Sequence, residues 1–426
     1  MRTRAAAIAL FSTATLVGAV LASTPLVADQ APGGSPAVGR QGGPGGPGRG
    51  GFGGRGRGTQ IQPGEECPPG TTESRPRFCS APEFPAPSIL DYRPRTTLVT
   101  GAHLVPRAKF PVIDSHNHTT IDADNIDEMI RQMDELNLRV LVNLSGGSSP
   151  DQIKQKVDFI RSTPHADRFR VFANVDFDNA DAPGWAASAV ARLEQSVANG
   201  AIGLKIFKNL GLTTTKSDGS RLHVDDPVLK PVWEACARLN IPVIIHTAEP
   251  QEFFSPLDYR NERWLELALF ANRRNYDPEG PSWEDLMGER DRMYAANPNT
   301  RFIGAHFDWY GSDLARASRQ LDRLPNLVLE VGAVLYEFGR QPRAAREFFV
   351  KYQDRILFGK DSFAASEFPY YWRVFETADE YFDYYRDYHA FWKLYGMDLP
   401  DEVLKKLYYG NALRVTPGLP QSGWPE

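Results

Sequence analysis

The sequence predicts an α/β fold in which eight parallel strands and their helices close into a (β/α)8 TIM barrel. From residue 99 onward, short β-rich runs alternate with longer helical patterns, as expected for successive strand-helix units. Polar residues gather at the carboxyl ends of five of these runs, and only ring closure brings those ends together. The predicted strands span residues 111–115, 140–144, 170–175, 201–207, 242–247, 301–306, 327–331 and 355–358.

The amino-terminal residues predict export to the periplasm or the exterior. Arg2 and Arg4 precede an apolar stretch of small residues, the pattern of a signal peptide, which we place at residues 1–28. A membrane anchor is the alternative, although Ser12 and Thr13 make the stretch less apolar. No later segment is long and apolar enough to span a bilayer, so we expect no membrane span in the mature chain.

Residues 29–60 predict a disordered linker. Glycine fills 14 of the 28 positions from 31 to 58, so the segment cannot bury enough surface to offset its ordering entropy. An Arg-Gly nucleic-acid segment is the alternative, with Phe52 as its one stacking aromatic. Residues 61–98 form an extension in which we expect a disulfide between Cys67 and Cys79, since an exported protein meets an oxidising compartment.

The charge distribution argues against nucleic acid as a partner of the body of the protein. The whole chain carries a formal charge of −5, whereas residues 1–60 hold six Arg and one Asp. The remaining residues, 61–426, therefore carry −10. An acidic body of this kind argues against nucleic acid as the main partner, because it repels phosphate backbones.

The end of the first predicted strand, Asp114-Ser115-His116-Asn117-His118, predicts a metal site. Alternate residues of a strand face one side, so the aspartate and both histidines share a face. Two imidazoles beside a carboxylate suit zinc or a similar first-row ion. Further candidate ligands follow later strands at His246, His306 and Asp361. A single strand-end histidine is more often a hydrogen-bonded core residue, so the set carries the prediction.

Helical patterns separate the predicted strands, with one long insertion. An open doubly wound sheet would also alternate in this way, but no Gly-x-Gly-x-x-Gly motif follows the first strand. The segment between the fifth and sixth strands is about twice as long as the others and is expected to overhang the barrel mouth or to pack on the surface. The predicted helices span residues 124–136, 151–161, 185–199, 228–240, 312–324 and 342–352.

From about residue 111 to residue 415 the chain resembles the amidohydrolase superfamily, in particular its amidohydrolase-related branch of metal-dependent hydrolases and decarboxylases. The resemblance lies in the order and spacing of several motifs rather than in any one of them. These are Val-Ile-Asp-Ser-His-Asn-His at 112–118, Ile-Gly-Leu-Lys-Ile at 202–206, Pro-Val-Ile-Ile-His at 242–246, Phe-Ile-Gly-Ala-His at 302–306, Ile-Leu-Phe-Gly-Lys-Asp at 356–361 and Tyr-Gly-Asn-Ala at 409–412.

The resemblance implies a role for each candidate residue. His116, His118, His246 and Asp361 would be the metal ligands. His306 would act as an acid or polarise the substrate, and Asp361 would also accept a proton. We expect Asp114 to fix the tautomer of an imidazole, with a structural hydrogen bond as the alternative. The candidate substrate-binding residues are Lys205, Glu249 and Trp309.

One divalent cation, zinc or else manganese or another first-row ion, is the expected cofactor. Some superfamily members bridge two metals with a carboxylated lysine at the position of Lys205, whereas this branch more usually holds one metal and can use the lysine to bind a substrate carboxylate. Bound zinc lowers the pKa of water from about 15.7 to about 7 and so supplies hydroxide at neutral pH.

The predicted reaction is hydrolysis of an amide, ester or lactone in a small molecule, which could bear a carboxylate. The alternatives are non-oxidative decarboxylation of an aromatic or unsaturated carboxylic acid, and an exported barrel that binds a metal or ligand without turnover. Assembly into a homo-oligomer stays open.

Overall fold

The computed structural model describes residues 58–85, 87–389 and 392–425. The chain divides into two compact units, with the boundary between residues 86 and 87. The predicted signal peptide and nearly all of the predicted linker lie outside the described residues. The predicted barrel domain begins at residue 99, twelve positions after the second unit does.

The first unit is a small antiparallel sheet with the strand order β1-β3-β2. Its strands are β1 (Gly58–Gln60), β2 (Thr72–Arg75) and β3 (Phe78–Ser80), so the last three positions of the predicted linker form a strand. A disulfide joins Cys67 to Cys79, whose side chain is buried. Because so few residues of this unit are buried, the covalent link takes over part of the role of a hydrophobic core.

The second unit contains the eight strand positions that the sequence predicts. A three-stranded parallel sheet has the order β4-β5-β6, and a six-stranded parallel sheet has the order β7-β8-β9-β10-β11-β12. The third predicted strand is divided at Phe172 into β6 and β7, which pair with opposite neighbours. The bounds are β4 (Val112–Asn117), β5 (Leu138–Asn143), β6 (Phe169–Val171), β7 (Ala173–Asn174), β8 (Leu204–Ile206), β9 (Val243–Ile245), β10 (Phe302–Gly304), β11 (Leu327–Glu330) and β12 (Ile356–Leu357).

Backbone hydrogen bonds between the last and first strands close the ring. Ser115 donates to the carbonyl of Phe358 over 3.0 Å, and Asp361 donates to the carbonyl of His116 over 2.6 Å. Asn117 and Asp361 also form a parallel bridge. The predicted (β/α)8 barrel is therefore confirmed, and its closure brings residues 245 positions apart onto one rim.

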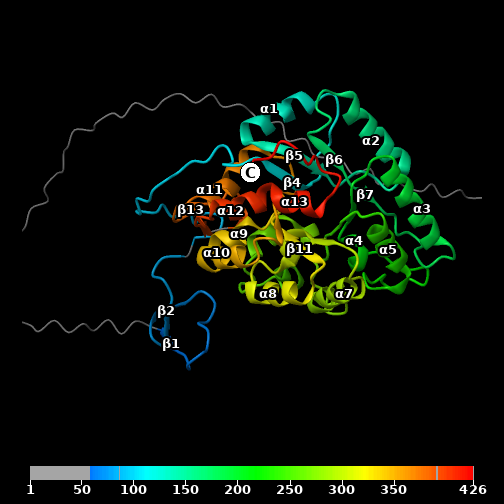
Figure 1. Ribbon diagram of the computed structural model, residues 1–426. Coiled ribbons are helices and arrows are strands. Elements are labelled where there is room, and N and C mark those ends of the chain that lie inside the picture. The colour runs from blue at the N-terminus through cyan, green and yellow to red at the C-terminus, as the bar shows by residue number, and fades with distance from the viewer. Residues whose placement is uncertain (1–57, 86, 390–391, 426) are drawn as a thin grey trace, which may run out of the picture. The chain divides into compact units, whose positions relative to one another are not determined.

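Helices surround the strands (Figure 1). The sequence caps the start of some of these helices. In α2, Gln152 accepts a hydrogen bond from the backbone of Ser149, and Pro150 lies in the first turn. The α-helices are α1 (Ile126–Leu136), α2 (Pro150–Ser162), α3 (Trp185–Ala198), α4 (Asn209–Leu212), α5 (Lys230–Arg238), α6 (Trp264–Leu269), α7 (Trp283–Ala296), α8 (Leu314–Arg323), α9 (Leu335–Arg340), α10 (Pro342–Lys351), α11 (Phe368–Glu376), α12 (Asp401–Lys405) and α13 (Asn411–Val415).

Shorter elements occupy the connections. The predicted insertion between β9 and β10 contains η2, α6, η3 and α7, and a two-stranded hairpin, β13-β14, follows α11. These elements are η1 (Pro227–Leu229), η2 (Gln251–Phe254), η3 (Ala271–Arg273), η4 (Ala305–Trp309), η5 (Ala365–Glu367), η6 (Asp387–His389), the π-helix η7 (Lys406–Gly410), β13 (Phe382–Asp383) and β14 (Lys393–Leu394).

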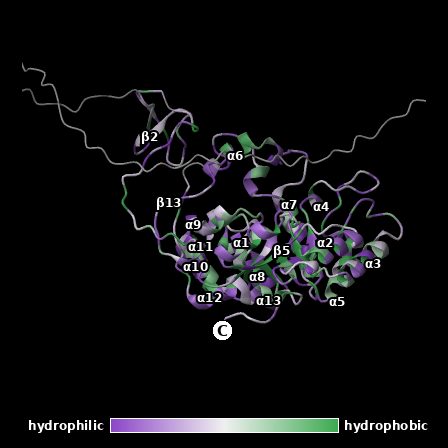
Figure 2. Ribbon diagram, turned by 90° about the horizontal axis from the view of Figure 1, so that it is seen from above, coloured by the Kyte–Doolittle hydropathy of each residue, from purple (hydrophilic) through white to green (hydrophobic). Residues whose placement is uncertain are grey.

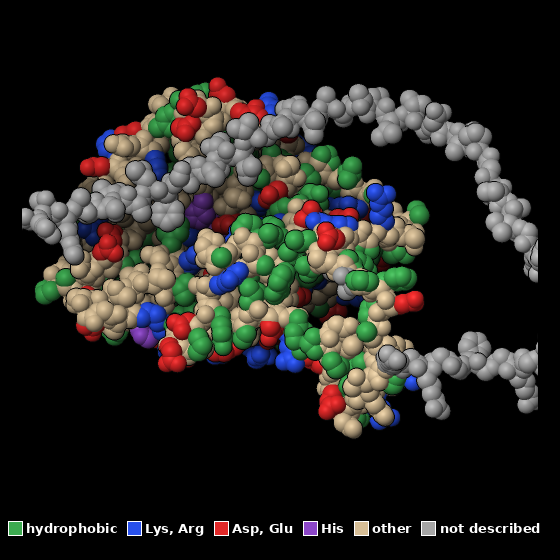
Figure 3. All heavy atoms as spheres, turned by 180° about the vertical axis from the view of Figure 1, so that it is seen from behind, with side chains coloured by type: hydrophobic (Ala, Val, Ile, Leu, Met, Phe, Trp, Pro, Cys, Tyr) green, Lys and Arg blue, Asp and Glu red, His purple; other side chains and the backbone are tan. Residues whose placement is uncertain are grey.

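The hydrophobic core lies between the strands and the inner faces of the helices. Every residue of β4, β9, β10 and β11 is buried, and α1 contributes Ile126, Met129 and Met133 from one face. Figure 2 shows hydrophobic residues concentrated around β5 within the ring of helices. Acidic and basic side chains are interspersed on the face seen in Figure 3. None of the described helices combines the length and apolar character needed to cross a membrane.

Candidate metal centre

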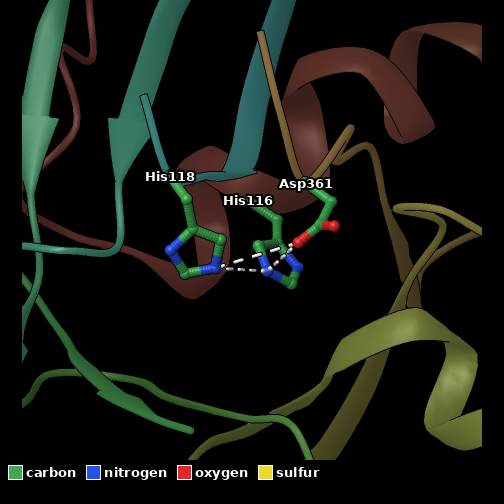
Figure 4. A group of neighbouring side chains, drawn as sticks. All are labelled: His116, His118 and Asp361. Carbon is green, nitrogen blue, oxygen red and sulfur yellow. Dashed lines mark hydrogen bonds and ion pairs between the residues drawn. The ribbon is translucent and has the colours of Figure 1, made fainter. Parts of the chain in front are cut away.

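His116, His118 and Asp361 converge at the carboxyl-terminal rim of the barrel. Both histidines lie at the end of β4, and the aspartate follows β12, the strand that closes the ring against β4. Ligand atoms of the three side chains all lie within 4.8 Å of one another. His116 Nε2 is 3.2 Å and His118 Nε2 is 3.8 Å from Asp361 Oδ1 (Figure 4). We call these three residues the ligand group.

Hydrogen bonds behind the ligand group orient both imidazoles. His116 Nδ1 donates to Glu330 Oε1 over 2.7 Å, and His118 Nδ1 lies 2.8 Å from the hydroxyl of Ser145. In each ring Nε2 is therefore the nitrogen that faces Asp361. Burial and the neighbouring His116 charge lower the pKa of His118 to about 2, so this imidazole is neutral at pH 7, as a metal ligand must be.

Glu330, at the end of β11, is a site residue that the sequence analysis missed. It is fully buried, and its carboxylate also accepts hydrogen bonds from the backbone N–H groups of His306 and Gly332, both over 2.6 Å. Burial alone would raise the pKa of Glu330, but His116 holds it at about 2. The signal was a single acid inside the otherwise apolar run 327–331, because a charge in a buried strand needs several partners.

Asp114 does not have the predicted role of fixing an imidazole tautomer. Its carboxylate accepts hydrogen bonds from the backbone N–H groups of His116 and Lys360, over 3.1 and 3.0 Å, and from the side-chain amide of Asn117. Glu330 makes the predicted contact with the imidazole instead. Asp114 thus ties β4 to the segment after β12, which is the structural alternative.

His246 and His306 form a second pair beside the ligand group. The sheet register aligns Ile245 with Gly304, so the two histidines follow neighbouring strands at nearly the same level. His306 Nδ1 lies 2.8 Å from the carbonyl of Gly332, which can only accept, so Nδ1 carries a proton. Burial lowers the pKa of His306 to about 3, so the ring is neutral and its Nε2 accepts from His246 Nδ1 over 3.2 Å.

Because the proton of His246 is on Nδ1, its Nε2 carries no proton and presents a lone pair. The atom is buried, has no hydrogen-bond partner among the described residues, and lies 3.5 Å from Glu249 Oε2, itself an acceptor. Two acceptors facing each other favour a cation or a donor between them. His246 does not belong to the ligand group, whose members lie mutually closer.

A left-handed turn follows β10 and presents His306 to the rim. His306, Phe307, Asp308 and Trp309 have φ values of 56°, 58°, 52° and 59°. Such backbone is unfavourable for residues other than glycine and is typical of functional sites. The Trp309 ring stacks on His306 with 4.7 Å between centroids, and its Nε1 donates to the carbonyl of Thr247.

The three candidate substrate-binding residues lie in two places. Lys205, at the middle of β8, is buried with Nζ 3.2 Å from His116 Nε2, and burial lowers its pKa to about 8. Glu249 and Trp309 line a cavity of about 190 Å³ above the rim, where Glu249 pairs with Lys208. The other lining residues are His246, Pro250, Phe253, Arg263, Glu266, Arg273, His306, Ala333, Tyr336, Asp361 and Arg386.

A closed barrel with imidazole and carboxylate side chains gathered on its carboxyl-terminal rim is the arrangement found in metal-dependent barrel enzymes. A family model described as Amidohydrolase matches residues 113–417. The chain therefore belongs to the amidohydrolase family, whose members are generally metal-dependent enzymes, and the resemblance seen in the sequence is confirmed.

Several solved structures match this chain at low sequence identity. They include an uncharacterized TIM-barrel protein from Bordetella bronchiseptica (14% identity, TM-score 0.47, covering 72% of this chain and 99% of that one). A putative amidohydrolase from Staphylococcus aureus has 16% identity and a TM-score of 0.45, with coverage of 72% and 99%. A 2,6-dihydroxybenzoate decarboxylase has 15% identity and a TM-score of 0.44, with coverage of 72% and 98%. A comparison with curated proteins gives no match.

Proposed function

We propose that the protein is a metal-dependent hydrolase that cleaves an amide, ester or lactone bond of a small molecule. The observation that carries the proposal is the ligand group, in which two imidazole nitrogens and a carboxylate oxygen lie within 4.8 Å of one another at the mouth of the barrel. Asp361 belongs to this group and also lines the cavity, so one carboxylate faces both the cation position and the substrate.

The residues present fit a single zinc or similar ion. His116, His118 and Asp361 would hold it. His246 lies outside this group, and its predicted role as a further ligand stays a prediction. Nitrogen and oxygen donors of this kind suit first-row divalent ions. Lys205 lies against His116 with its pKa lowered to about 8, and carboxylation of this amine would be needed before it could bridge a second metal.

The chain's own residues account for the proton transfers. A bound divalent ion polarises the carbonyl under attack and lowers the pKa of water. The pKa of Asp361 is held well below its usual range by His116 and His306 despite burial, so the carboxylate is ionised and can accept the proton of the attacking water. His306 is neutral at rest, so the proton that Asp361 takes from the water would pass to His306, whose protonated form is a strong acid, and from there to the leaving group.

Metal analysis of the purified protein and a substrate panel test the proposal together. We expect about one zinc or similar ion per chain, and release of the acid product from an ester, lactone or amide. Hydrolysis and carbon dioxide release are scored separately. Carbon dioxide from aromatic acids without hydrolysis would replace the proposal with a decarboxylase. Bound metal with neither reaction would indicate a binding protein.

A further inference from the structure

Arg386 differs from the other cationic side chains that line the cavity because it has no carboxylate partner among the described residues. Lys208 pairs with Glu249, and Arg263 and Arg273 both pair with Glu266. For Arg386, the described part of the chain supplies neither an ion pair nor a side-chain hydrogen bond. Within the described part of the chain, no neighbouring acid pairs with its positive charge in the cavity wall.

The surroundings of Arg386 add uncommitted hydroxyl groups. Its guanidinium carbon lies 5.4 Å from the ring centroid of Tyr385 and 6.0 Å from that of Tyr384. The hydroxyls of both tyrosines are buried and have no hydrogen-bond partner among the described residues. A group bound beside Arg386 would therefore meet two hydroxyls that can each donate a hydrogen bond.

A second cation beside Tyr385, Lys360, does not need an external anion. Lys360 is fully buried, its Nζ lies 5.7 Å from the centroid of the Tyr385 ring, and it forms an ion pair with Glu367. An anion entering this part of the wall would therefore meet Arg386 as the unbalanced charge. The guanidinium presents a planar fork of N–H groups, which matches a carboxylate or a phosphate better than an ammonium does.

We infer that Arg386 binds an anionic group of the substrate, either a carboxylate or a phosphate. The substrate would then be an acidic amide, ester or lactone. The inference rests on the proposed function for the reaction itself. Arg386 lines both the cavity that contains His306 and Asp361 and a second cavity of about 590 Å³. The second cavity is lined by Arg93, Arg95 and Trp392 among others, so the rest of a larger acid has space beyond Arg386.

Calorimetric titration of the full-length protein with three probes tests this assignment. The probes are benzoate, its neutral isostere benzamide, and phenyl phosphate. R386M removes the charge but keeps an unbranched side chain, and we expect it to weaken binding of the preferred anion about 10- to 100-fold, as for a lost charge-assisted hydrogen bond. Benzamide affinity should not change. Tighter binding of benzoate or of phenyl phosphate to the parent protein identifies which anion the site takes.

R273M is the matched control, because Arg273 lines the same cavity but already pairs with Glu266. It should leave benzoate affinity unchanged. R386K covers the case in which R386M does not fold: it keeps the charge but loses the fork, so benzoate should still bind more weakly, with benzamide constant. Equal benzoate affinity in the parent protein and in the folded Arg386 variants would overturn the inference.

The binding measurement needs no turnover, so the hydrolase proposal and the anion site at Arg386 can be disproved independently of each other. Arg386-dependent benzoate binding in a protein that hydrolyses nothing on the panel would overturn the hydrolase proposal and leave the anion site. Equal hydrolysis of neutral and acidic esters by the parent protein and R386M would overturn the anion site and leave the hydrolase.

Discussion

The rim of the barrel and the wall of the cavity are built in different ways. We use rim for the strand-end residues His116, His118, His246, His306, Glu330 and Asp361. We use wall for the cavity-lining residues Glu249, Pro250, Phe253, Arg263, Glu266, Arg273 and Arg386. Rim side chains take their directions from a closed parallel sheet, whose backbone hydrogen bonds fix each strand end. Several charged wall side chains are instead held by ion pairs with one another, such as Arg263 with Glu266 and Arg273 with Glu266.

The difference separates two tasks. The sheet holds the rim residues so close together that two consecutive hydrogen bonds fix the tautomers of both histidines. The first joins His306 to the carbonyl of Gly332, and the second joins His246 to His306. The wall consists of short helices and loops, which can change without altering the barrel. We therefore expect rim substitutions to remove metal or turnover, and wall substitutions to change stability or substrate choice.

H116A and H306A separate metal binding from turnover within the rim and give the largest expected effect. H116A removes a ligand and should abolish bound metal and lower activity by at least about 10⁴-fold, because the Lewis acid that polarises the carbonyl and activates the water is lost. D361A should do the same. H306A should keep the metal and lower kcat by about 10²- to 10⁴-fold. Metal content by mass spectrometry and kcat on the same samples test this, and activity of H116A without metal would contradict it.

E266Q tests whether a buried charge in the wall stabilises the fold. The Glu266 side chain is 2% exposed; burial would raise its pKa, but His389 and Arg263 lower it to about 2. A carboxylate with a lowered pKa stabilises the fold above its unfolded pKa, near 4.5, and loses that contribution as pH falls toward 2. We expect E266Q to cost about 3 kcal/mol of unfolding free energy at pH 7, and the difference to shrink between pH 4.5 and 2.

Urea unfolding at several pH values measures that difference. E284Q is the matched control, because Glu284 pairs with Arg316 at the surface, where its side chain is 60% exposed. An exposed ion pair contributes at most about 1 kcal/mol. Because the comparison is between variants, acid effects on other groups cancel. A pH-independent loss in E266Q would show that the side chain acts by packing and not by charge.

The sequence predicted most of the rim because strand ends have a local signature. The five predicted residues His116, His118, His246, His306 and Asp361 each follow a short apolar run, and strand geometry then sets which side chains share a face. Glu330 was missed because its role depends on three donors from two other strands and its own loop. Asp114 was assigned to the wrong partner for the same reason, since distance along the chain does not reveal which carboxylate lies behind the imidazole.

The wall could not be predicted in this detail. The sequence around Arg386 does not show that this arginine lacks an acidic partner while Arg263 and Arg273 each have one. Such ion pairs depend on how the loops fold, which the sequence pattern does not reveal. The left-handed backbone from His306 to Trp309 was also hidden, since no glycine marks it. The sequence does contain a glycine, Gly304, just before this turn. The turn requires it, because a Cβ at this position would overlap the Asp308 carboxylate.

Glu330 connects the ligand group to His306, and its substitution E330Q has the smallest expected effect on the rim. Glu330 Oε1 accepts from both His116 Nδ1 and the backbone of His306, and Oε2 accepts from Gly332. A glutamine keeps the shape but turns one acceptor into a donor, so one of these three bonds is lost. Loss of such a contact behind a ligand typically weakens metal binding 10- to 100-fold. Chelator competition should show that decrease in zinc affinity.

D114N is the control that distinguishes contact with the imidazole from contact with the backbone. Asp114 is as buried as Glu330 and lies on the same strand as His116, but burial raises its pKa to about 7 and its hydrogen bonds go to backbone N–H groups and Asn117. A neutral amide is therefore close to what the site already holds, and D114N should change zinc affinity less than E330Q does. Equal losses in the two variants would mean that burial of an acid near the rim, and not the bond to His116 Nδ1, sets the affinity of the site.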